Sequence, residues 1–254
     1  MKKNNYVKTR EEIEIIAQGG KLLRNILHNS AKLAVPGTST AELNQFAEKE
    51  IAKIGGRPSF KGYGEKGNEF PAGLCTSIND VIVHGIPSRD AALTEGDIIS
   101  LDIGMEYKGL YTDTAITVPV GKVSGKILKL VNTTKQCLYE AVKMAKAGNK
   151  TGDIGHAIQS LAEDAGFSVV RDLVGHGVGY SVHEDPPVPC YGKSEQGIKL
   201  EEGMVLAIEP MLCEGNWKIL IDDDGWTIRT ADGSLSAHFE HTIAVGKNGG
   251  RVLT

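Results

Sequence analysis

Two aspartates lie inside apolar stretches of the chain, which is an unusual place for a carboxylate. Asp102 and Asp113 fall within SLDIGMEYKGLYTDTA at residues 100–115, and the residues around them are typical of buried β-strands. A carboxylate that loses its water without gaining a partner costs several kcal/mol or more. Taken alone, Asp102 is equally compatible with capping a turn at a strand end. A bound metal ion would make both aspartates tolerable.

The second half of the chain repeats the order of features found in the first half. Each half contains two helical segments, a His-Gly turn, a strand that ends in an acid, and then a second acid. The matching pairs are GTSTAEL (37–43) with GNKTGDI (148–154), VHGI (83–86) with GHGV (175–178), EGDIISLD (95–102) with EGMVLAIE (202–209), and TDTAI (112–116) with FEHTI (239–243). Four matches in order predict an internal duplication within one domain, with pseudo-repeats at about 9–121 and 122–254.

The duplication predicts where the remaining partners of the two aspartates lie. If the halves pack about a pseudo-two-fold axis, Asp102 approaches Glu209 and Asp113 approaches Glu240. Four clustered carboxylates repel one another unless they are protonated or bind cations. His84 and His176, from the two His-Gly turns, would lie near the same cleft. Carboxylates together with imidazoles suit first-row divalent ions, and the amount of charge indicates two ions, about 3.5–4 Å apart.

Periodicity predicts the elements that position these side chains. Apolar residues at helical spacing predict helices at 9–33, 40–54, 124–147 and 152–165, the second with Thr40 as its N-cap. Short β-like runs occupy 74–78, 81–86, 97–104 and 110–120. We therefore expect two similar α+β halves.

Composition excludes several other classes of protein. The chain has 254 residues, of which 41% are hydrophobic and 24% are charged, and its net charge of −4 gives no basic signature for binding nucleic acid. Four widely spaced cysteines without a C-x-x-C pair argue against a disulfide framework and a zinc ribbon. No apolar run reaches the roughly 18 residues of a membrane span, and no hydrophobic segment follows the N-terminal lysines. We therefore expect a cytoplasmic protein.

A set of short motifs resembles the bacterial-type (type I) methionine aminopeptidases of the pita-bread metallopeptidase superfamily. The similarity extends from about residue 8 to 253, and its motifs are VHGIP, LDIG, YTDTA, GHGVG, VHEDPPVP, IEPM and FEHT. The resemblance implies a pita-bread fold, with two pseudo-symmetric halves and a central antiparallel sheet covered by helices. It also implies removal of the N-terminal methionine from nascent proteins and peptides when the second residue is small. The family further suggests a monomer that contacts ribosomes transiently.

The resemblance also implies a role for each site residue. Asp102 would chelate one divalent ion, His176 and Glu209 the other, and Asp113 and Glu240 would bridge the two ions, which could be cobalt, manganese, iron or zinc. Glu209 would transfer the proton during metal-assisted hydrolysis. The remaining roles fall to His183, which would stabilise the substrate carbonyl, and to His84, which would assist at the scissile amide nitrogen.

Further positions matching the family suggest a substrate pocket and a sodium ion. The residues that would line a slot for the methionine side chain are Phe60, Tyr63, Cys75 and Trp226, with Phe70 close by. A sodium ion would bind near the carbonyl groups of Asn79 and Val81. The sequence departs from the family in two places, because GEKGNEF at 64–70 is longer than the usual link and His238 replaces a glutamine. These departures would affect specificity and pH dependence.

Other readings of the same residues remain open. An X-Pro-cleaving peptidase of the same fold is one alternative, although such relatives usually carry an additional N-terminal domain. A pita-bread protein that binds without catalysis is another, although such proteins lose metal ligands. His28, His156 and His241 are expected to be surface or structural residues. The segment IDDDGW at 221–226 is expected to be a solvated acidic turn rather than a metal loop.

Overall fold

An antiparallel sheet forms the centre of the molecule in the computed structural model, which describes residues 6–254. Within these residues nine strands belong to the sheet, with β1-β6-β7-β16-β11-β9-β10 in order, β4 paired with β6 and β17 with β16. The strands are β1 (Arg57–Pro58), β4 (Leu74–Ile78), β6 (Ile98–Tyr107), β7 (Leu110–Pro119), β9 (Gly175–Gly177), β10 (Glu184–Val188), β11 (Val205–Ile208), β16 (Glu240–Ala244) and β17 (Arg251–Val252).

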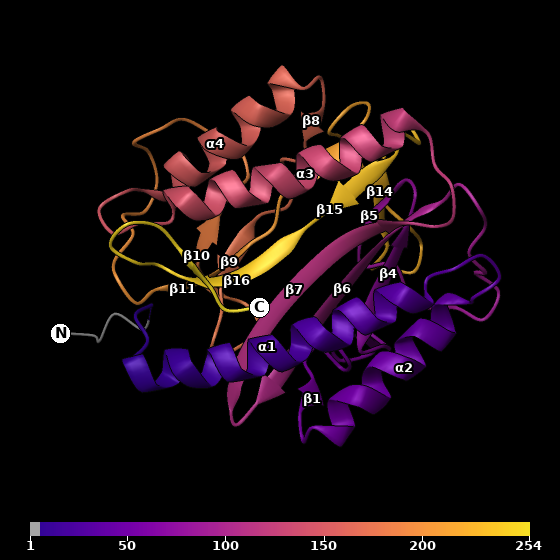
Figure 1. The fold of residues 1–254 in the computed structure, drawn as a ribbon, viewed down its shortest axis with the longest axis horizontal. Coiled ribbons are helices and arrows are strands. Elements are labelled where there is room, and N and C mark those ends of the chain that lie inside the picture. The colour runs from indigo at the N-terminus through magenta and orange to yellow at the C-terminus, as the bar shows by residue number, and fades with distance from the viewer. Residues whose placement is uncertain (1–5) are drawn as a thin grey trace.

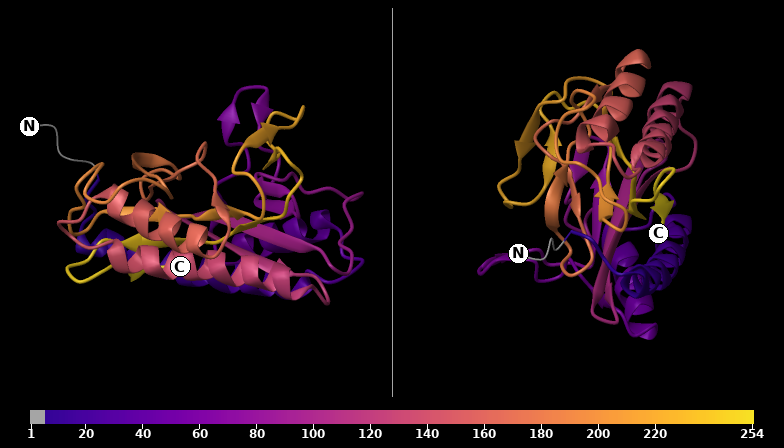
Figure 2. Two further views of the ribbon diagram at one scale, coloured as in Figure 1. Left: turned by 90° about the horizontal axis from the view of Figure 1, so that it is seen from above. Right: turned by 90° about the vertical axis from the view of Figure 1, so that its left-hand side faces the viewer.

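Four helices cover one face of this sheet, as Figure 1 and the left view of Figure 2 show. They are α1 (Arg10–Leu33), α2 (Thr40–Lys53), α3 (Gly125–Met144) and α4 (Thr151–Asp164). All four helices predicted from periodicity are confirmed, with small differences at their ends. Helix α1 contacts β6 and β7, whereas α3 contacts β7, β11 and β16, so the two longest helices lie across neighbouring parts of the sheet.

The start of α2 corrects one expectation. Thr40 is not the N-cap, because Ser39 takes this position in an extended conformation and its hydroxyl accepts a hydrogen bond from the Glu42 amide. The Glu42 carboxylate in turn accepts a hydrogen bond from the Ser39 amide, which completes a capping box. Asp153 accepts a hydrogen bond from the backbone amide of Lys150 in the same way at the start of α4. The matching segments 37–43 and 148–154 therefore begin two helices with similar local chemistry.

Three smaller sheets among the described residues adjoin the main sheet. One contains β8 (Ser168–Val169), β12 (Met211–Cys213) and β15 (Ser236–His238), and it contacts α3 and α4. The other two lie on the side of the main sheet away from the helices (Figure 2, left), and the first of them contains β5 (Val81–Val83), β13 (Ile219–Ile221) and β14 (Ile228–Thr230). The third is a hairpin of β2 (Gly64–Glu65) and β3 (Asn68–Glu69). The strand expected at 81–86 ends at Val83, because His84 adopts a left-handed conformation with φ of 58°.

The apolar core lies between the helices and the main sheet. One cluster of buried side chains joins α1 and α2 to β4 and β6, and a second cluster joins α3 and α4 to β11 and β16. Strand β6 continues through Asp102 to Tyr107, so this acid lies inside the strand and does not end it as expected. The strand continues because residues 103–107 keep their pairing with β7. No helix within residues 6–254 has the length and apolar character needed to cross a membrane.

Candidate metal centre and active site

Strands β6 and β7 hold the first two carboxylates of the site. Asp102 lies opposite Ala115, and Asp113 lies opposite Gly104, so each acid faces a very small residue across the strand pair. Asp113 is held further by its backbone amide, which donates a hydrogen bond of 2.9 Å to the Thr242 hydroxyl. Because the small partners leave space on this face, the pairing creates a cavity next to two buried carboxylates.

The second half of the chain contributes Glu240 from β16, Glu209 from the end of β11 and His176 from β9. Glu240 lies opposite Ala115, the same residue that faces Asp102 from the other side. His176 lies between two glycines in a strand wedged tightly between its neighbours. A Cβ at Gly175 would approach the Ala207 carbonyl to 2.4 Å, so only glycine permits this close strand packing.

These five side chains converge on one place. Candidate ligand atoms of Asp102, Asp113 and Glu240 lie within 4.8 Å of one another, and so do those of His176, Glu209 and Glu240. His176 Nε2 is 3.6 Å from a Glu209 carboxylate oxygen, while its Nδ1 contacts the Gly177 carbonyl at 2.9 Å. This second contact orients the ring and leaves Nε2 facing the carboxylates.

Burial without partners marks the carboxylates as a site for cations. Asp102, Asp113 and Glu240 each have a buried oxygen that has no hydrogen-bond partner among the described residues. Burial raises the pKa of Asp102 to about 7, and burial together with the neighbouring acids raises the pKa values of Asp113, Glu209 and Glu240 well above normal. Bound divalent cations would remove both the desolvation cost and the repulsion.

The donor set fits divalent metal ions. Four carboxylates and one imidazole are oxygen and nitrogen ligands of the kind that first-row divalent metals accept. Burial lowers the pKa of His176 to about 3, so its imidazole is neutral near pH 7 and can act as a ligand. His183 also lies near this cluster, since one of its ring nitrogens is within 4.8 Å of candidate ligand atoms of Asp113 and His176.

Two further histidines surround the carboxylates. Burial lowers the pKa of His84 to about 4, and this residue adopts a left-handed backbone with φ of 58°. The conformation is held because the Gly85 amide donates a hydrogen bond of 3.2 Å to the Ser77 hydroxyl. Such backbone strain is commonly found at functional sites. His238 is buried next to Glu209, with 3.7 Å between its Nε2 and a carboxylate oxygen, and burial lowers its pKa to about 3.

A pocket of about 300 Å³ opens beside the carboxylates. All of the predicted pocket residues line it, namely Phe60, Tyr63, Phe70, Cys75 and Trp226. The Tyr63 and His183 rings pack edge to face with 4.8 Å between their centroids, and the His183 and His176 rings pack in the same way with 4.4 Å between theirs. A continuous path of rings therefore connects the apolar wall of the pocket to the carboxylate cluster.

The hairpin at 64–70 closes one side of this pocket. The Trp226 indole nitrogen donates a hydrogen bond of 3.0 Å to the Asn68 carbonyl, and the Phe70 ring meets the indole at 5.4 Å. A Cβ at Gly64 would approach the indole to 2.6 Å, which explains the glycine at this position. The segment that differs from the family pattern is thus packed directly against a pocket residue.

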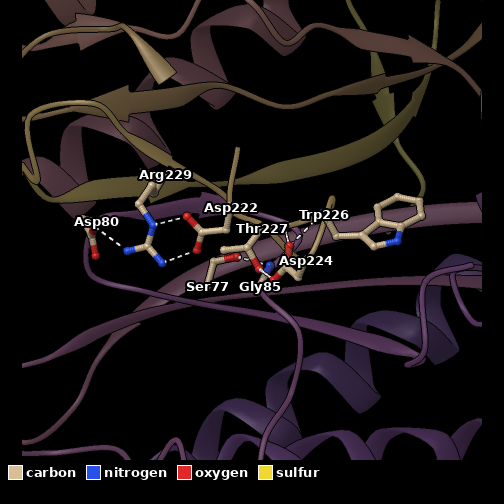
Figure 3. Close-up of polar contacts among 8 residues, drawn as sticks. All are labelled: Ser77, Asp80, Gly85, Asp222, Asp224, Trp226, Thr227 and Arg229. Atoms are coloured by element: carbon tan, nitrogen blue, oxygen red, sulfur yellow. Dashed lines mark hydrogen bonds and ion pairs between the residues drawn. The ribbon is translucent and has the colours of Figure 1, made fainter. Parts of the chain in front are cut away.

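Sequence reasoning missed the polar residues that hold Trp226 in place. Figure 3 shows Arg229 between Asp222 and Asp80, with bonds of 2.7 Å and 2.8 Å from the guanidinium group. The Asp224 carboxylate accepts a 2.8 Å hydrogen bond from the Trp226 amide. The expected solvated turn at 221–226 is therefore also an anchor for the indole. Antiparallel pairing of β13 with β14 brings Asp222 and Arg229 together, which their sequence spacing does not reveal.

A second missed contact lies next to His183. The Glu184 carboxylate accepts a hydrogen bond of 2.8 Å from the Ser181 amide and forms an ion pair with Lys8, whose side chain is almost fully buried. Lys8 also lies over the Tyr180 ring at 4.4 Å. These contacts tie the segment before α1 to the loop that carries His183. A single lysine near the N-terminus gives no sequence signal for such a role.

The remaining predicted residues lie outside the cluster. The Asn79 carbonyl accepts a hydrogen bond of 2.9 Å from the Ser236 amide, and Val81 pairs with Arg229 in a small sheet. His156 is exposed on α4, His28 is exposed on α1, and His241 Nδ1 contacts the Thr254 hydroxyl at 3.1 Å on the helix-covered side. The sodium site near Asn79 and Val81 stays a prediction.

Comparison with known proteins is consistent with this geometry. The model of metallopeptidase family M24 matches residues 14–247. The chain belongs to metallopeptidase family M24. Within this M24 family, it is 46% identical over 248 residues to the methionine aminopeptidase of Clostridium acetobutylicum, an alignment that covers 98% of each chain.

Solved structures of M24 relatives confirm the fold. The crystal structure of methionine aminopeptidase from Thermotoga maritima superposes with a TM-score of 0.94 at 43% identity, covering 98% of each chain. An X-Pro aminopeptidase from the same organism has a TM-score of 0.76 at 20% identity, and this chain covers 62% of it. The predicted pita-bread architecture, with its central antiparallel sheet covered by helices, is therefore confirmed.

Proposed function

We propose that this M24 metallopeptidase removes the N-terminal methionine from peptides and nascent proteins when the second residue is small. The observation that carries the proposal is a pocket with aromatic walls that ends at a cluster of buried carboxylates, three of which have an oxygen without a hydrogen-bond partner among the described residues. Such a pocket accepts one apolar side chain and presents the adjoining peptide bond to the polar cluster. Its relatives at over 40% identity across the whole chain are named methionine aminopeptidases.

The carboxylate cluster is proposed to bind two divalent ions chosen from cobalt, manganese, iron and zinc. In this proposal Asp102 would hold one ion, His176 and Glu209 would hold the other, and Asp113 and Glu240 would help to hold both. The bound ions would polarise the substrate carbonyl and lower the pKa of a water molecule towards neutrality. Three buried carboxylate oxygens that have no hydrogen-bond partner within residues 6–254 support this assignment.

Glu209 is proposed to carry the proton during hydrolysis. Burial and the nearby Asp102 charge raise the pKa of its carboxyl group, and bound cations would offset both effects and restore the carboxylate that can accept a proton. It would accept a proton from the attacking water and return it to the leaving amine. His238 Nε2, 3.7 Å from the carboxylate, is positioned to orient Glu209 without contacting substrate.

His183 and His84 are proposed to contact the peptide bond. Partial desolvation lowers the pKa of His183, so a neutral ring donates one N–H towards the carbonyl oxygen as negative charge develops there. His84 would assist at the amide nitrogen. Both rings line the pocket together with the carboxylates, which supports a shared role in one reaction.

The methionine side chain is proposed to occupy the space between Phe60, Tyr63, Cys75 and Trp226. Burial and the neighbouring carboxylates raise the pKa of Cys75, so it remains a thiol and acts as a small apolar wall. The proposal further includes a sodium ion near Asn79 and Val81, a monomeric state, a cytoplasmic location and transient contact with ribosomes.

The proposal is tested by measuring hydrolysis of two tripeptides by metal-stripped protein to which each candidate metal is added separately. Met-Ala-Ser should release methionine with at least one metal, whereas Ala-Pro-Ser should remain intact. An X-Pro peptidase would show the reverse preference. A protein that hydrolyses neither peptide with any of the four metals would contradict the proposed function.

A further inference from the structure

A second cavity lies on the helix-covered side of the sheet, away from the proposed metal centre. Its volume is about 910 Å³, and it is bounded by α1, α3, β7, β16 and the C-terminal residues. Figure 1 shows the C-terminus between α1 and α3, in front of β7 and β16. The floor includes residues 115–118 of β7, which follow Asp113 in the same strand. This cavity is therefore separate from the proposed active site.

The cavity collects positive charge from two helices. Arg24 and Lys32 lie on one face of α1, and α3 contributes Lys135. His28 and His241 also line the cavity, but burial lowers their pKa values, so both rings are neutral near pH 7. No aspartate or glutamate side chain lines this cavity among the described residues. This local excess of cations contrasts with the net charge of −4 of the whole chain.

The cationic side chains have no carboxylate partners in the described part of the chain. Arg24, Lys32 and Lys135 form no ion pair within residues 6–254; Lys32 donates a hydrogen bond to the Asn29 side chain, and Lys135 lies 5.9 Å from the Tyr139 ring. A terminal carboxylate at Thr254 would offset at most one of the three charges. The cavity thus retains a net positive charge that a ligand could neutralise.

The rest of the lining is apolar. Side chains of Val131, Leu138 and Phe239 are buried at its walls, and Tyr139 remains 47% exposed at the α3 edge. The volume falls within the roughly 300–1,000 Å³ range of small-molecule pockets, which are mostly apolar with a few charged groups. The combination fits a molecule that has a flat or apolar body and an anionic group.

We propose that this cavity binds an organic polyphosphate of nucleotide size. Its phosphates would contact Arg24, Lys32 and Lys135, and its aromatic body would lie against Val131, Leu138 and Tyr139. Three cations exceed what one carboxylate can neutralise, whereas a triphosphate carries several charges. Arginine also binds phosphate oxygens in a bidentate manner. Arg24 and Lys32 are separated by about 12 Å along the helix axis, a span that a nucleoside triphosphate can bridge.

Calorimetric titration with adenosine triphosphate (ATP) tests this proposal. The metal-loaded protein should bind ATP, and the double variant Arg24→Glu/Lys135→Glu should bind it at least tenfold more weakly. The matched control is Lys21→Glu/Lys49→Glu, which makes the same charge change on α1 and α2 outside the cavity and should retain the original affinity. The neutral double variant Arg24→Gln/Lys135→Gln serves as a second test if charge reversal prevents folding.

Three comparisons separate this site from other modes of binding. Asp113→Ala should bind ATP as tightly as the original protein, and loss of binding in this variant would assign ATP to the metal centre instead. Inorganic triphosphate and adenosine should each bind at least tenfold more weakly than ATP, since each offers only part of the ligand. The proposal would be overturned if ATP at up to about 1 mM gave no heat of binding. It would also be overturned if the protein bound dodecyl phosphate but not ATP.

Discussion

The two faces of the main sheet carry opposite charges, although they are formed by the same strands. In β16, Glu240 points to the carboxylate cluster, whereas the next residue, His241, lines the cationic cavity under the helices. In β7, Asp113 likewise lines the pocket beside the carboxylates, whereas Ile116 lines the cavity under the helices. Alternation along a strand therefore allows adjacent residues to serve two unlike sites.

The two faces differ most in how their charges meet water. The acids are buried, and their pKa values are raised by burial and by the charges of the neighbouring acids. The cations lie at the ends of long, exposed side chains that keep their hydration. A buried charge demands a specific partner, whereas an exposed charge only favours one. Substitutions on the acidic face should therefore have much larger effects.

The largest expected effect comes from Asp113→Ala. This change removes a buried carboxylate between Asp102 and Glu240, so bound metal should be lost and hydrolysis of Met-Ala-Ser should fall below detection. Metal content is measured by elemental analysis after desalting. The exposed Asp90→Ala is the matched control and should keep both metal and activity. Full metal occupancy in the Asp113 variant would show that this acid is not a shared ligand.

His183→Ala should have the next largest effect. Metal should remain bound, because four carboxylates and His176 are intact, while kcat should fall by roughly 10²–10³ as the loss of one transition-state hydrogen bond predicts. KM for Met-Ala-Ser should change much less than kcat. His156→Ala, on the surface of α4, provides the control. An unchanged kcat would remove His183 from the proposed reaction.

The stability of metal-stripped protein should depend on pH in a direction set by the acids. Their folded-state pKa values are raised, to about 7 for Asp102 and well above the ordinary value for Asp113, so their contribution to stability is present at low pH and is lost as pH rises through those values. The buried histidines have lowered pKa values, and they stop contributing to the slope above their unfolded pKa of about 6.5.

Raising the pH from about 7 to 9 should therefore lower the Tm of stripped protein, and each carboxyl group that stays protonated in the folded state over this interval contributes about 1.4 kcal/mol per pH unit. Differential scanning calorimetry measures this change. Protein loaded with divalent metal should show a flatter profile, because its acids are neutralised by the ions. A stripped protein whose Tm rises over this interval would contradict the raised pKa values.

The smallest effect is expected on the cationic face. Arg24→Glu should alter kcat/KM for Met-Ala-Ser by less than twofold and leave metal content unchanged, since its exposed side chain lies across the sheet from the acids. Steady-state kinetics at matched ionic strength provide the comparison. A tenfold change would show that the two faces are energetically coupled and would erase the contrast between them.

Much of this arrangement could be predicted from the sequence because its signals are local. Helical periodicity gave all four helices, and runs of β-branched residues located β4, β6 and β7. Asp102 and Asp113 could be recognised because charged residues rarely occur inside such runs. The N-cap of α2 was predicted one residue too late, at Thr40 and not at Ser39, because both side chains carry a hydroxyl that can cap a helix.

The support for the site could not be predicted, because it depends on contacts between distant segments. Nothing near Trp226 in the sequence indicates that Asn68 receives its indole N–H. The cationic cavity was missed for a similar reason, since Arg24, Lys135 and His241 are spread over the chain and only packing of α1 and α3 on the sheet unites them. Net charge averages over the molecule and conceals such local groupings.

The ion pair between Lys8 and Glu184 has a practical consequence for protein engineering. A tag fused at the N-terminus leaves this lysine in place, but deletion through residue 8 would leave Glu184 without its cationic partner next to the loop of His183. Shortened variants would then combine an intact set of acids with a poorly oriented histidine. Comparing such deletions with Lys8→Met would separate the role of the charge from that of the chain segment, and would set the shortest useful length for biotechnological versions of the enzyme.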